Sequence, residues 1–265
     1  MSFMGHLEAL RWHLVRAAAV IMAICIVAFF YSDRLFKDVV LAPTSQSFPT
    51  YDMLCKVGKV FHAEESTCIT VDSTKKLQTL GASEQFSTYV WICMLAGIIL
   101  GFPYLLYELW KFVRPALKSS EAKPVRGFVL VGSVLFLTGT LFGYFILFPL
   151  SYNFLIKFQI SPEHIETNNT LDDYISLLST MALVTGLVFE LPILVYFLSR
   201  IGILTPKFMR KYRKHAVVIL LILAAVITPS PDWLSQMIVF IPLFLLYEIS
   251  IFVSANVVKK YNLEQ

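Results

Sequence analysis

Three glutamates stand inside long apolar stretches of this chain, where a carboxylate could bind a partner, pair with a cation or carry a proton. Glu190 is the strongest case, since it lies in the apolar run 185–192 directly before Leu191 and Pro192. An ionisable group at the centre of a membrane helix costs about 2.5–3.5 kcal/mol on insertion scales, and such groups are usually functional. Pro192 cannot donate a backbone hydrogen bond, so the turn before it is disturbed. We expect a working Glu190; the alternative is a protonated carboxyl that bonds a neighbouring helix and only stabilises the fold.

Glu108 and Glu248 are weaker candidates of the same kind. Glu108 lies near the end of its apolar stretch, three residues before Lys111, and could pair or reach water there. Glu248 lies within the last apolar stretch. For both residues a structural role is the more ordinary interpretation.

The sequence shows no constellation typical of an enzyme or a metal centre. It lacks GxSxG, HExxH, GxGxxG and the phosphate-binding GxxxxGK[ST] pattern. The five histidines are scattered, and the four cysteines (Cys25, Cys55, Cys68 and Cys93) form no CxxC pair. We therefore predict neither catalysis nor a cofactor.

The composition indicates a membrane protein. Hydrophobic residues make up 57% of the 265 residues and charged residues 15%, with mean hydropathy +0.70. Soluble domains are about 45–50% apolar and about 25% charged. The net charge of +4 comes from cations at the ends of apolar stretches, which does not indicate nucleic-acid binding.

The apolar stretches predict an all-α protein with six transmembrane helices in a single polytopic domain. We place them at about 14–31, 86–110, 128–148, 174–198, 216–228 and 234–258. A membrane helix needs about 20 residues, so the fifth stretch is marginal and could instead be a re-entrant segment. Cations before it and the rigid segment 228–232 after it favour a short span. Four prolines (Pro103, Pro149, Pro192 and Pro242) predict kinked helices and a concave bundle.

The distribution of lysine and arginine predicts the orientation. Of the 22 such residues, 15 fall in the amino-terminal segment, in the loops after the second and fourth spans, and in the tail. By the positive-inside rule these parts are cytoplasmic, and the loop at about 32–85 lies outside as a small cap. Cys55 and Cys68 both lie in that loop, where disulfides persist, and we predict that they pair.

Several ordered segments resemble TatC, the family that forms the receptor core of the twin-arginine translocase. The segment 3–14, FMGHLEALRWHL, resembles that family's amino-terminal signature. The segment 102–117, FPYLLYELWKFVRPAL, resembles its second-span signature. Further matches are FELP at 189–192, TPSPDWLSQ at 228–236 and IPLFLLYE at 241–248. The resemblance covers nearly the whole chain.

The resemblance implies a fold, a function and partners. It implies a glove-like six-helix bundle with two short final helices, in a bacterial inner membrane with both ends in the cytoplasm. The family binds twin-arginine signal peptides of folded precursors and assembles with TatA- and TatB-type single-span partners, and the proton-motive force drives export. It also implies a homo-oligomer in the receptor complex, surrounded by membrane lipid.

The resemblance also assigns site residues. For signal-peptide binding it indicates Glu121, Phe112, Glu8 and Arg11, and for intramembrane polar or partner contacts Glu190, Gln236, Glu248 and Pro43. The chain departs from the family pattern His-Leu-any-Glu-Leu-Arg, because Ala9 stands at the glutamate position. Glu8 is one residue early, about 100° around a helix. Either Glu8 takes over through a local shift, or the recognition site is weakened.

Two other functions are open to such a sequence. A secondary transporter would also place a carboxylate within the membrane, but it usually shows two related halves, and we find none here. A structural assembly protein would show no affinity for a twin-arginine peptide. The receptor interpretation has a chemical basis of its own, since the planar guanidinium of arginine suits bidentate carboxylate contact and lysine cannot copy it.

Overall fold

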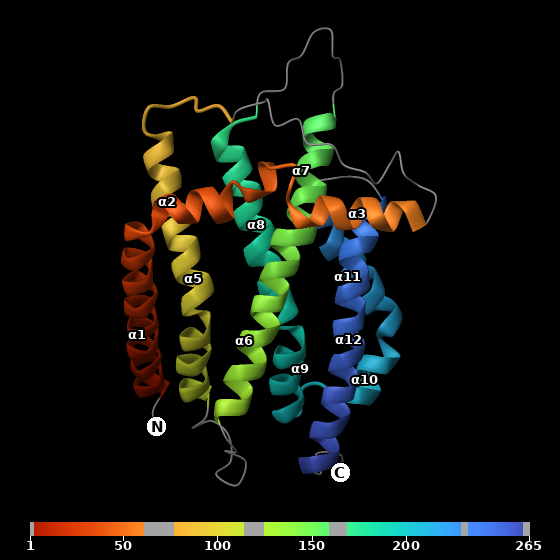
Figure 1. Ribbon diagram of the computed structural model, residues 1–265. Coiled ribbons are helices and arrows are strands. Elements are labelled where there is room, and N and C mark those ends of the chain that lie inside the picture. Colours follow the sequence, from red (N-terminus) through yellow and green to blue (C-terminus); the bar gives the residue numbers. More distant parts are fainter. Residues whose placement is uncertain (1–2, 61–76, 114–124, 159–168, 229–232, 262–265) are drawn as a thin grey trace. The chain divides into compact units, whose positions relative to one another are not determined.

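The computed structural model describes residues 3–60, 77–113, 125–158, 169–228 and 233–261, which are almost entirely helical (Figure 1). The chain divides into two compact units. Unit 1 comprises Met1–Leu137 and Asn168–Ser176, and unit 2 comprises Thr138–Thr167 and Leu177–Gln265. Two helices, α6 and α8, continue from one unit into the other.

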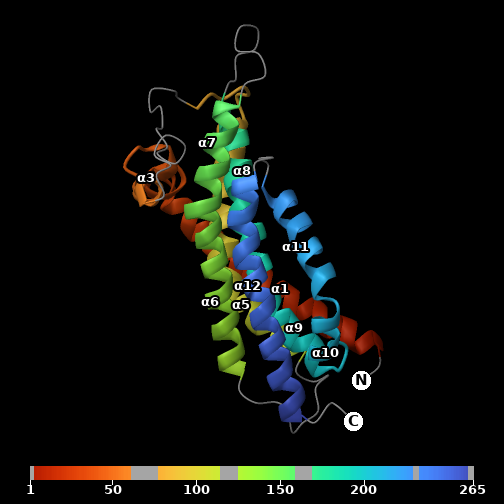
Figure 2. The same cartoon turned by 90° about the vertical axis from the view of Figure 1, so that its right-hand side faces the viewer.

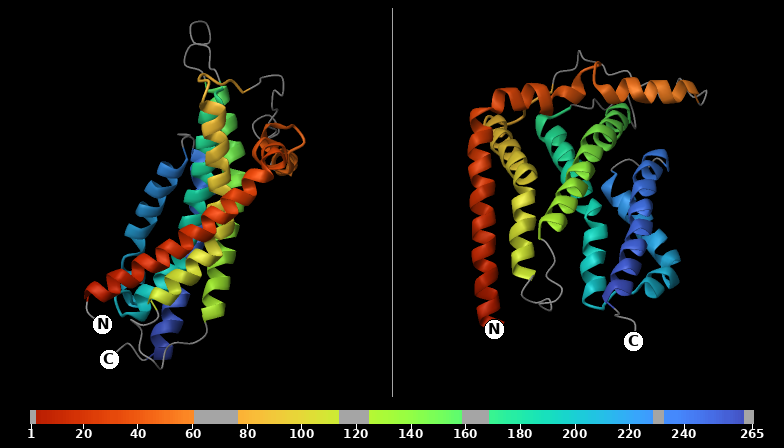
Figure 3. Two further views of the ribbon diagram at one scale, coloured as in Figure 1. Left: turned by 90° about the vertical axis from the view of Figure 1, so that its left-hand side faces the viewer. Right: turned by 60° about the horizontal axis from the view of Figure 1, so that its bottom comes forward.

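Unit 1 is built on two long helices that lie side by side, α1 (Phe3–Phe30) and α5 (Glu84–Val113) (Figure 3). Their contact depends on two glycines of α5 that are four residues apart. A Cβ on Gly97 would lie 2.8 Å from the carbonyl oxygen of Ile21, and one on Gly101 would lie 2.8 Å from the Ile21 side chain. Small residues at this spacing let two membrane helices approach closely.

The first half of α6 (Val125–Phe142) belongs to unit 1 and packs on α5 through aromatic side chains. The rings of Phe102 and Phe136 are stacked with centroids 3.6 Å apart, and those of Trp110 and Phe128 with centroids 4.5 Å apart. Phe102, Trp110 and Phe136 are all buried. These rings therefore hold the two helices together along much of their length.

The predicted outer loop contains short helices that turn away from α1 in Figure 1. They are α2 (Ser32–Arg34), the π turn η1 (Leu35–Val40), the 3-10 turn η2 (Ala42–Thr44) and α3 (Pro49–Val60). The Tyr174 hydroxyl donates to the Val40 carbonyl at 2.6 Å, so the loop is fixed to the start of α8. The described part of this loop is therefore helical and attached to α8, and its role as an outer cap stays a prediction.

Glu84 ties the start of α5 to the start of α8 (Leu171–Phe189). Its carboxylate accepts hydrogen bonds from the backbone N–H groups of Leu80, Gly81 and Asp172 at 2.6, 3.1 and 3.2 Å. An isolated parallel β-bridge between Gln78 and Thr170 lies next to it. Because the carboxylate bonds both segments, the beginnings of these two helices are held in one place.

Unit 2 contains a second close helix contact that also depends on two glycines four residues apart. The π turn η5 (Gly143–Leu147) joins α6 to α7 (Phe148–Lys157). A Cβ on Gly139 would lie 2.7 Å from the Cβ of Phe189, and one on Gly143 would overlap the carbonyl group of Met181. The backbone of α6 and η5 thus lies directly against α8.

The remaining helices of unit 2 are α9 (Leu191–Arg200), α10 (Pro206–Lys211), α11 (Arg213–Ile227) and α12 (Trp233–Tyr261). Both α9 and α11 pack along α12, and α11 lies beside it in Figure 2. The buried hydroxyl of Ser199 donates to that of Ser254 at 2.8 Å, which joins α9 to α12.

Within the described residues, five helical segments are long and apolar enough to cross a membrane, and each contains or closely overlaps a predicted span. They are Glu8–Phe30, Glu84–Phe112, Gly127–Lys157, Leu171–Arg200 and Ser235–Lys259. The fifth predicted span corresponds to α11, whose 15 residues reach about 22 Å, less than the roughly 30 Å of hydrocarbon. The last helix, α12, has 29 residues, so of the two final helices expected to be short only α11 is short.

Candidate functional site

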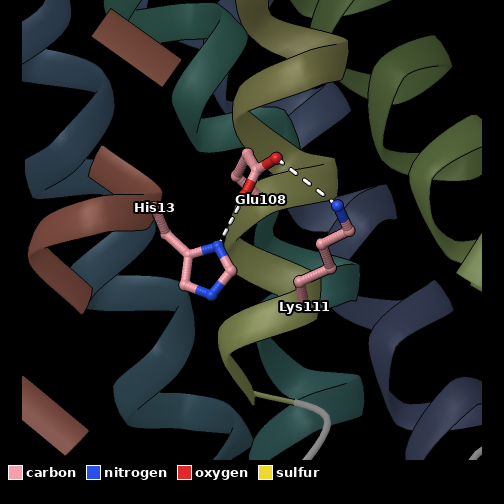
Figure 4. Close-up of polar contacts among 3 residues, drawn as sticks. All are labelled: His13, Glu108 and Lys111. Atoms are coloured by element: carbon pink, nitrogen blue, oxygen red, sulfur yellow. Dashed lines mark hydrogen bonds and ion pairs between the residues drawn. The ribbon is translucent and has the colours of Figure 1, made fainter. Parts of the chain in front are cut away.

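A polar cluster of His13, Glu108 and Lys111 joins α1 to α5 (Figure 4). His13 Nδ1 lies 2.5 Å from Glu108 Oε2, and Lys111 Nζ lies 3.6 Å from Glu108 Oε1. Glu108 is buried, with 2% of its side chain exposed, whereas His13 and Lys111 reach the surface. Lys111 also lies over the ring of Tyr107, 4.3 Å from its centroid. A buried carboxylate is stable here because a histidine and a lysine both compensate it.

Phe112, a predicted signal-peptide residue, belongs to the same neighbourhood. Its ring meets that of His13 edge to face, with centroids 6.3 Å apart. Phe112 follows Lys111 directly and is half-buried. The beginning of α1 and the end of α5 are therefore brought together around His13.

The other predicted recognition residues lie on α1 or outside the described part of the chain. Glu8 and Arg11 are exposed on the first turns of α1, and Ala9 is half-buried. Glu121 lies outside the described residues, so its distance from Phe112 stays a matter of prediction. Glu8 and Arg11 are five and two residues before His13, on the helix that carries the cluster.

Glu190 lies where the predicted fourth span is broken. The helix α8 ends at Phe189, α9 begins at Leu191, and Glu190 forms the turn between them. Pro192 is the second residue of α9, and because it has no N–H, the carbonyl of Val188 loses its usual partner. The kink expected from Glu190 and Pro192 is therefore present.

The side chain of Glu190 is in an unusual environment. Both carboxylate oxygens are buried, and neither bonds to a residue that the structure describes. The hydroxyls of Thr140, Ser151 and Thr185, all in unit 2, are in the same situation within the described residues. Buried polar atoms without partners are rare, and each calls for an explanation such as bound water, a ligand or a partner.

The other predicted polar contacts are used inside the chain. The amide nitrogen of Gln236 donates to the Leu221 carbonyl at 3.1 Å, linking α12 to α11. Arg213 Nε donates to Glu248 Oε1 at 2.6 Å, and its Nη2 forms an ion pair with the same oxygen. Pro43 is buried in η2, and its carbonyl accepts from the Tyr51 hydroxyl at 2.6 Å. Each of these residues has a structural partner, whatever else it binds.

The cysteines divide into two sets. Cys25 and Cys93 are free thiols within predicted spans, and Cys55 on α3 is disulfide-bonded. Cys68 lies outside the described residues, so its pairing with Cys55 stays a prediction. Among the described residues, no group of three or more histidine, cysteine, aspartate or glutamate side chains could hold a metal ion.

Sequence reasoning missed two features. His13 was not expected to meet Glu108, because 95 residues separate them and no local pattern links them. The glycine pairs 97/101 and 139/143 were also missed, although GxxxG within an apolar stretch is a readable signal for close helix packing.

These observations define a class, a multi-pass helical membrane protein with polar groups kept inside its spans. The family described as Sec-independent protein translocase protein (TatC) matches residues 5–242. A TatC protein of Blattabacterium sp. subsp. Periplaneta americana is 40% identical over 262 residues, which cover 98% of this chain and 97% of the relative. The TatCd protein of Bacillus subtilis is 34% identical, and the alignment covers 98% of this chain and 94% of that protein.

Solved structures agree with these relatives. A crystal structure of the twin-arginine translocase receptor TatC is 30% identical and has a TM-score of 0.68, covering 94% of this chain and 97% of that one. The same receptor crystallised in DDM gives a TM-score of 0.70. The chain belongs to the TatC family of Sec-independent protein translocase components, which confirms the family and the all-α membrane fold predicted from the sequence.

Proposed function

We propose that this chain is the signal-peptide receptor of a twin-arginine translocase and that it binds the arginine pair at the surface formed by the start of α1, Phe112 and the loop that carries Glu121. The observation that carries the proposal is the contact between His13 and Glu108 at 2.5 Å. That contact places the amino-terminal helix beside Phe112, so two of the three expected recognition elements are neighbours.

The chemistry of the surface suits an arginine pair. Carboxylates accept paired N–H bonds from a guanidinium, and such charge-assisted contacts contribute about 1.5–3 kcal/mol each. Glu8 is exposed on α1, and Phe112 offers an aromatic face on which a guanidinium can stack. A peptide with lysines in place of its two arginines would lose the bidentate contact.

Binding of a twin-arginine peptide to the purified full-length chain tests the proposal, with a Lys-Lys version of the peptide as control. We expect Glu121→Ala to weaken binding by roughly ten- to a hundredfold, since about 1.4 kcal/mol is tenfold. Equal affinity for the two peptides, or no effect of Glu8→Ala and of Glu121→Ala, would refute these recognition residues while leaving the family intact.

Besides Glu121, the family has a second recognition carboxylate at the position that Ala9 occupies here, and variants at positions 8 and 9 test what replaces it. Because Ala9 replaces the family glutamate, this chain should bind weakly, and Ala9→Glu should strengthen binding. If Ala9→Glu has no effect while Glu8→Ala removes binding, then Glu8 has taken over the role. The two variants therefore separate a weakened site from a shifted one.

The same proposal includes an orientation and partners. Both termini face the cytoplasm and the loop that carries Cys55 lies outside, as the positive-inside rule indicates. Reporter fusions at Lys56 and at Lys260 should then report opposite sides of the membrane. Glu190, with a buried carboxylate at a helix break, is the group that we assign to contact with TatA- or TatB-type partners during export.

A further inference from the structure

We propose that a surface on α10 and the start of α11 binds the headgroup of an anionic phospholipid. This basic–aromatic surface consists of Phe208, Arg210, Lys211, Tyr212 and Lys214, all of which are exposed. It lies in unit 2 and does not depend on signal-peptide recognition.

The local charge of this part of the chain is strongly positive. Residues 191–231 contain six of the 22 lysines and arginines and no aspartate or glutamate. Arg213 is compensated by Glu248 on α12. Arg210, Lys211 and Lys214 form no ion pair with any residue that the structure describes. Their charge is therefore available to an external anion.

Rings and lysines alternate along α10 and into the start of α11. The dipeptides at 207–208, 211–212 and 214–215 each place a lysine before an aromatic or imidazole ring, at spacings of four and three residues. The rings of Phe208 and Tyr212 have centroids 4.6 Å apart, and Tyr212 and His215 follow at 5.6 Å. Phe208 and Tyr212 are 48% and 41% exposed. Rings and lysines in this arrangement suit the membrane interface, where rings lie at headgroup level and ammonium groups reach the phosphates.

The surface is held rigidly, which favours specific binding over loose attraction. The Thr205 hydroxyl caps α10 by accepting from the Phe208 N–H at 3.2 Å. Met209 is buried beside Val195 and Ile251, and its carbonyl accepts from the Tyr247 hydroxyl at 2.8 Å. Because α10 is fixed to α12, the backbone that carries these cations loses little further freedom when they bind.

The continuation of the chain indicates a lipid rather than a soluble anion. The helix α11 starts within the surface, and its exposed apolar side chains run on from the cations: Val218, Ile219, Ile222 and Val226. A phospholipid can place its phosphate on the cations and its acyl chains along these side chains. A free phosphate could use only the first of these contacts.

The test measures retention of added phosphatidylglycerol, against phosphatidylcholine, by the purified full-length chain in detergent. A cation near an anionic lipid surface contributes about fivefold in affinity, so R210Q/K211Q/K214Q should lower phosphatidylglycerol affinity about a hundredfold. The control R34Q/K37Q/K157Q removes the same charge from exposed positions elsewhere. It should change the affinity for phosphatidylglycerol by less than about threefold. The charge-neutral F208A/Y212A should lower affinity for the lipid and leave that for inorganic phosphate unchanged.

Three results would overturn the proposal. One is that both charge triples lower lipid affinity equally, which would mean that only net charge matters. Another is that inorganic phosphate displaces the lipid at equal concentration, which would indicate a simple anion site. The third is full retention by R210Q/K211Q/K214Q. A charge-preserving variant, R210K/K211R/K214R, should retain the lipid, and it separates loss of binding from loss of fold.

Discussion

Unit 1 and unit 2 each contain a pair of glycines four residues apart, and each contains a glutamate inside a span whose carboxylate is buried. Gly97 and Gly101 seat α5 against α1, and Gly139 and Gly143 seat α6 and η5 against α8. In unit 1 the nearby carboxylate, Glu108, is bonded by a histidine and a lysine. In unit 2 the carboxylate of Glu190 has no partner among the described residues.

This difference indicates that Glu108 has a structural role, whereas Glu190 still has the capacity to bond another group. A buried charge that is fully paired holds two elements together, and removing one partner leaves the other uncompensated. A buried carboxylate without a partner costs desolvation free energy, and a group that bonds it would recover part of that cost. Removing the carboxylate should therefore lower stability at Glu108 and lower transport at Glu190.

The largest expected effect concerns the glycine contact of unit 2. A Cβ at Gly143 would overlap the backbone carbonyl of Met181, which cannot rotate away as a side chain can. We expect Gly143→Val to cost about 3 kcal/mol or more in unfolding free energy, measured by denaturation in detergent. Gly127→Val near the start of α6 is the control, since nothing lies within 4 Å of a Cβ at that position. Equal stability of the two variants would refute this close contact.

The next effect concerns transport through Glu190. Glu190→Gln keeps the shape and removes the charge, so we expect export to fall at least about tenfold while the unfolding free energy does not fall, because no hydrogen bond to a described residue is lost and an unpaired buried charge is removed. The fall in export is measured with a twin-arginine precursor in cells that lack the native protein. Unchanged export would assign Glu190 a purely structural role.

Glu108 should show the reverse pattern in stability. Because its carboxylate bonds His13, we expect a double-mutant cycle with Glu108→Gln and His13→Gln to give a coupling energy of about 1 kcal/mol, near the upper part of the range for polar contacts in membrane proteins. Since the carboxylate is buried, added salt should leave this value largely unchanged. A coupling energy of zero would mean that His13 does not stabilise the carboxylate of Glu108, which would then resemble the unpaired carboxylate of Glu190.

The smallest effect concerns the glycine contact of unit 1. A Cβ on Gly101 would meet the Ile21 side chain, which can change rotamer, whereas one on Gly97 would meet the Ile21 backbone oxygen. We expect Gly101→Ala to cost less than about 1 kcal/mol and Gly97→Ala to cost more. Thermal unfolding of the two variants checks the order, and the reverse order would contradict the geometry at Ile21.

Much of the fold could be predicted because its signals are local. The apolar stretches located the spans, the run before Pro192 located the break at Glu190, and the shortness of α11 followed from the length of its stretch. The apolar stretch at 234–258 also located α12, whereas the resemblance to the family implied a short final helix, which its 29 residues contradict.

Contacts that join distant parts of the chain could not be predicted from one sequence. Nothing near His13 indicates that its ring will meet a carboxylate 95 residues away. The Glu84 carboxylate likewise bonds the backbone of Asp172, a contact that depends on the packing of α5 and α8 and not on any motif. The resemblance supplied roles for Phe112 and Glu190, whereas only the structure shows what surrounds each side chain.

The π turn η5 bears on how this chain tolerates insertions and deletions. A π turn inside a helix is equivalent to one residue added to an α-helical stretch, so the surface after it is rotated by about 100° relative to an uninterrupted helix. Gly143, at its first position, faces α8, whereas Leu147 and Phe148 at its end are buried among other side chains. Deleting one residue between 143 and 147 would let this stretch become regular α-helix and leave α7 facing the same way, whereas the same stretch wound as α-helix without a deletion would turn all of α7 by about 100°. The register of α7 therefore depends on five residues of its own span more than on the loops at its ends.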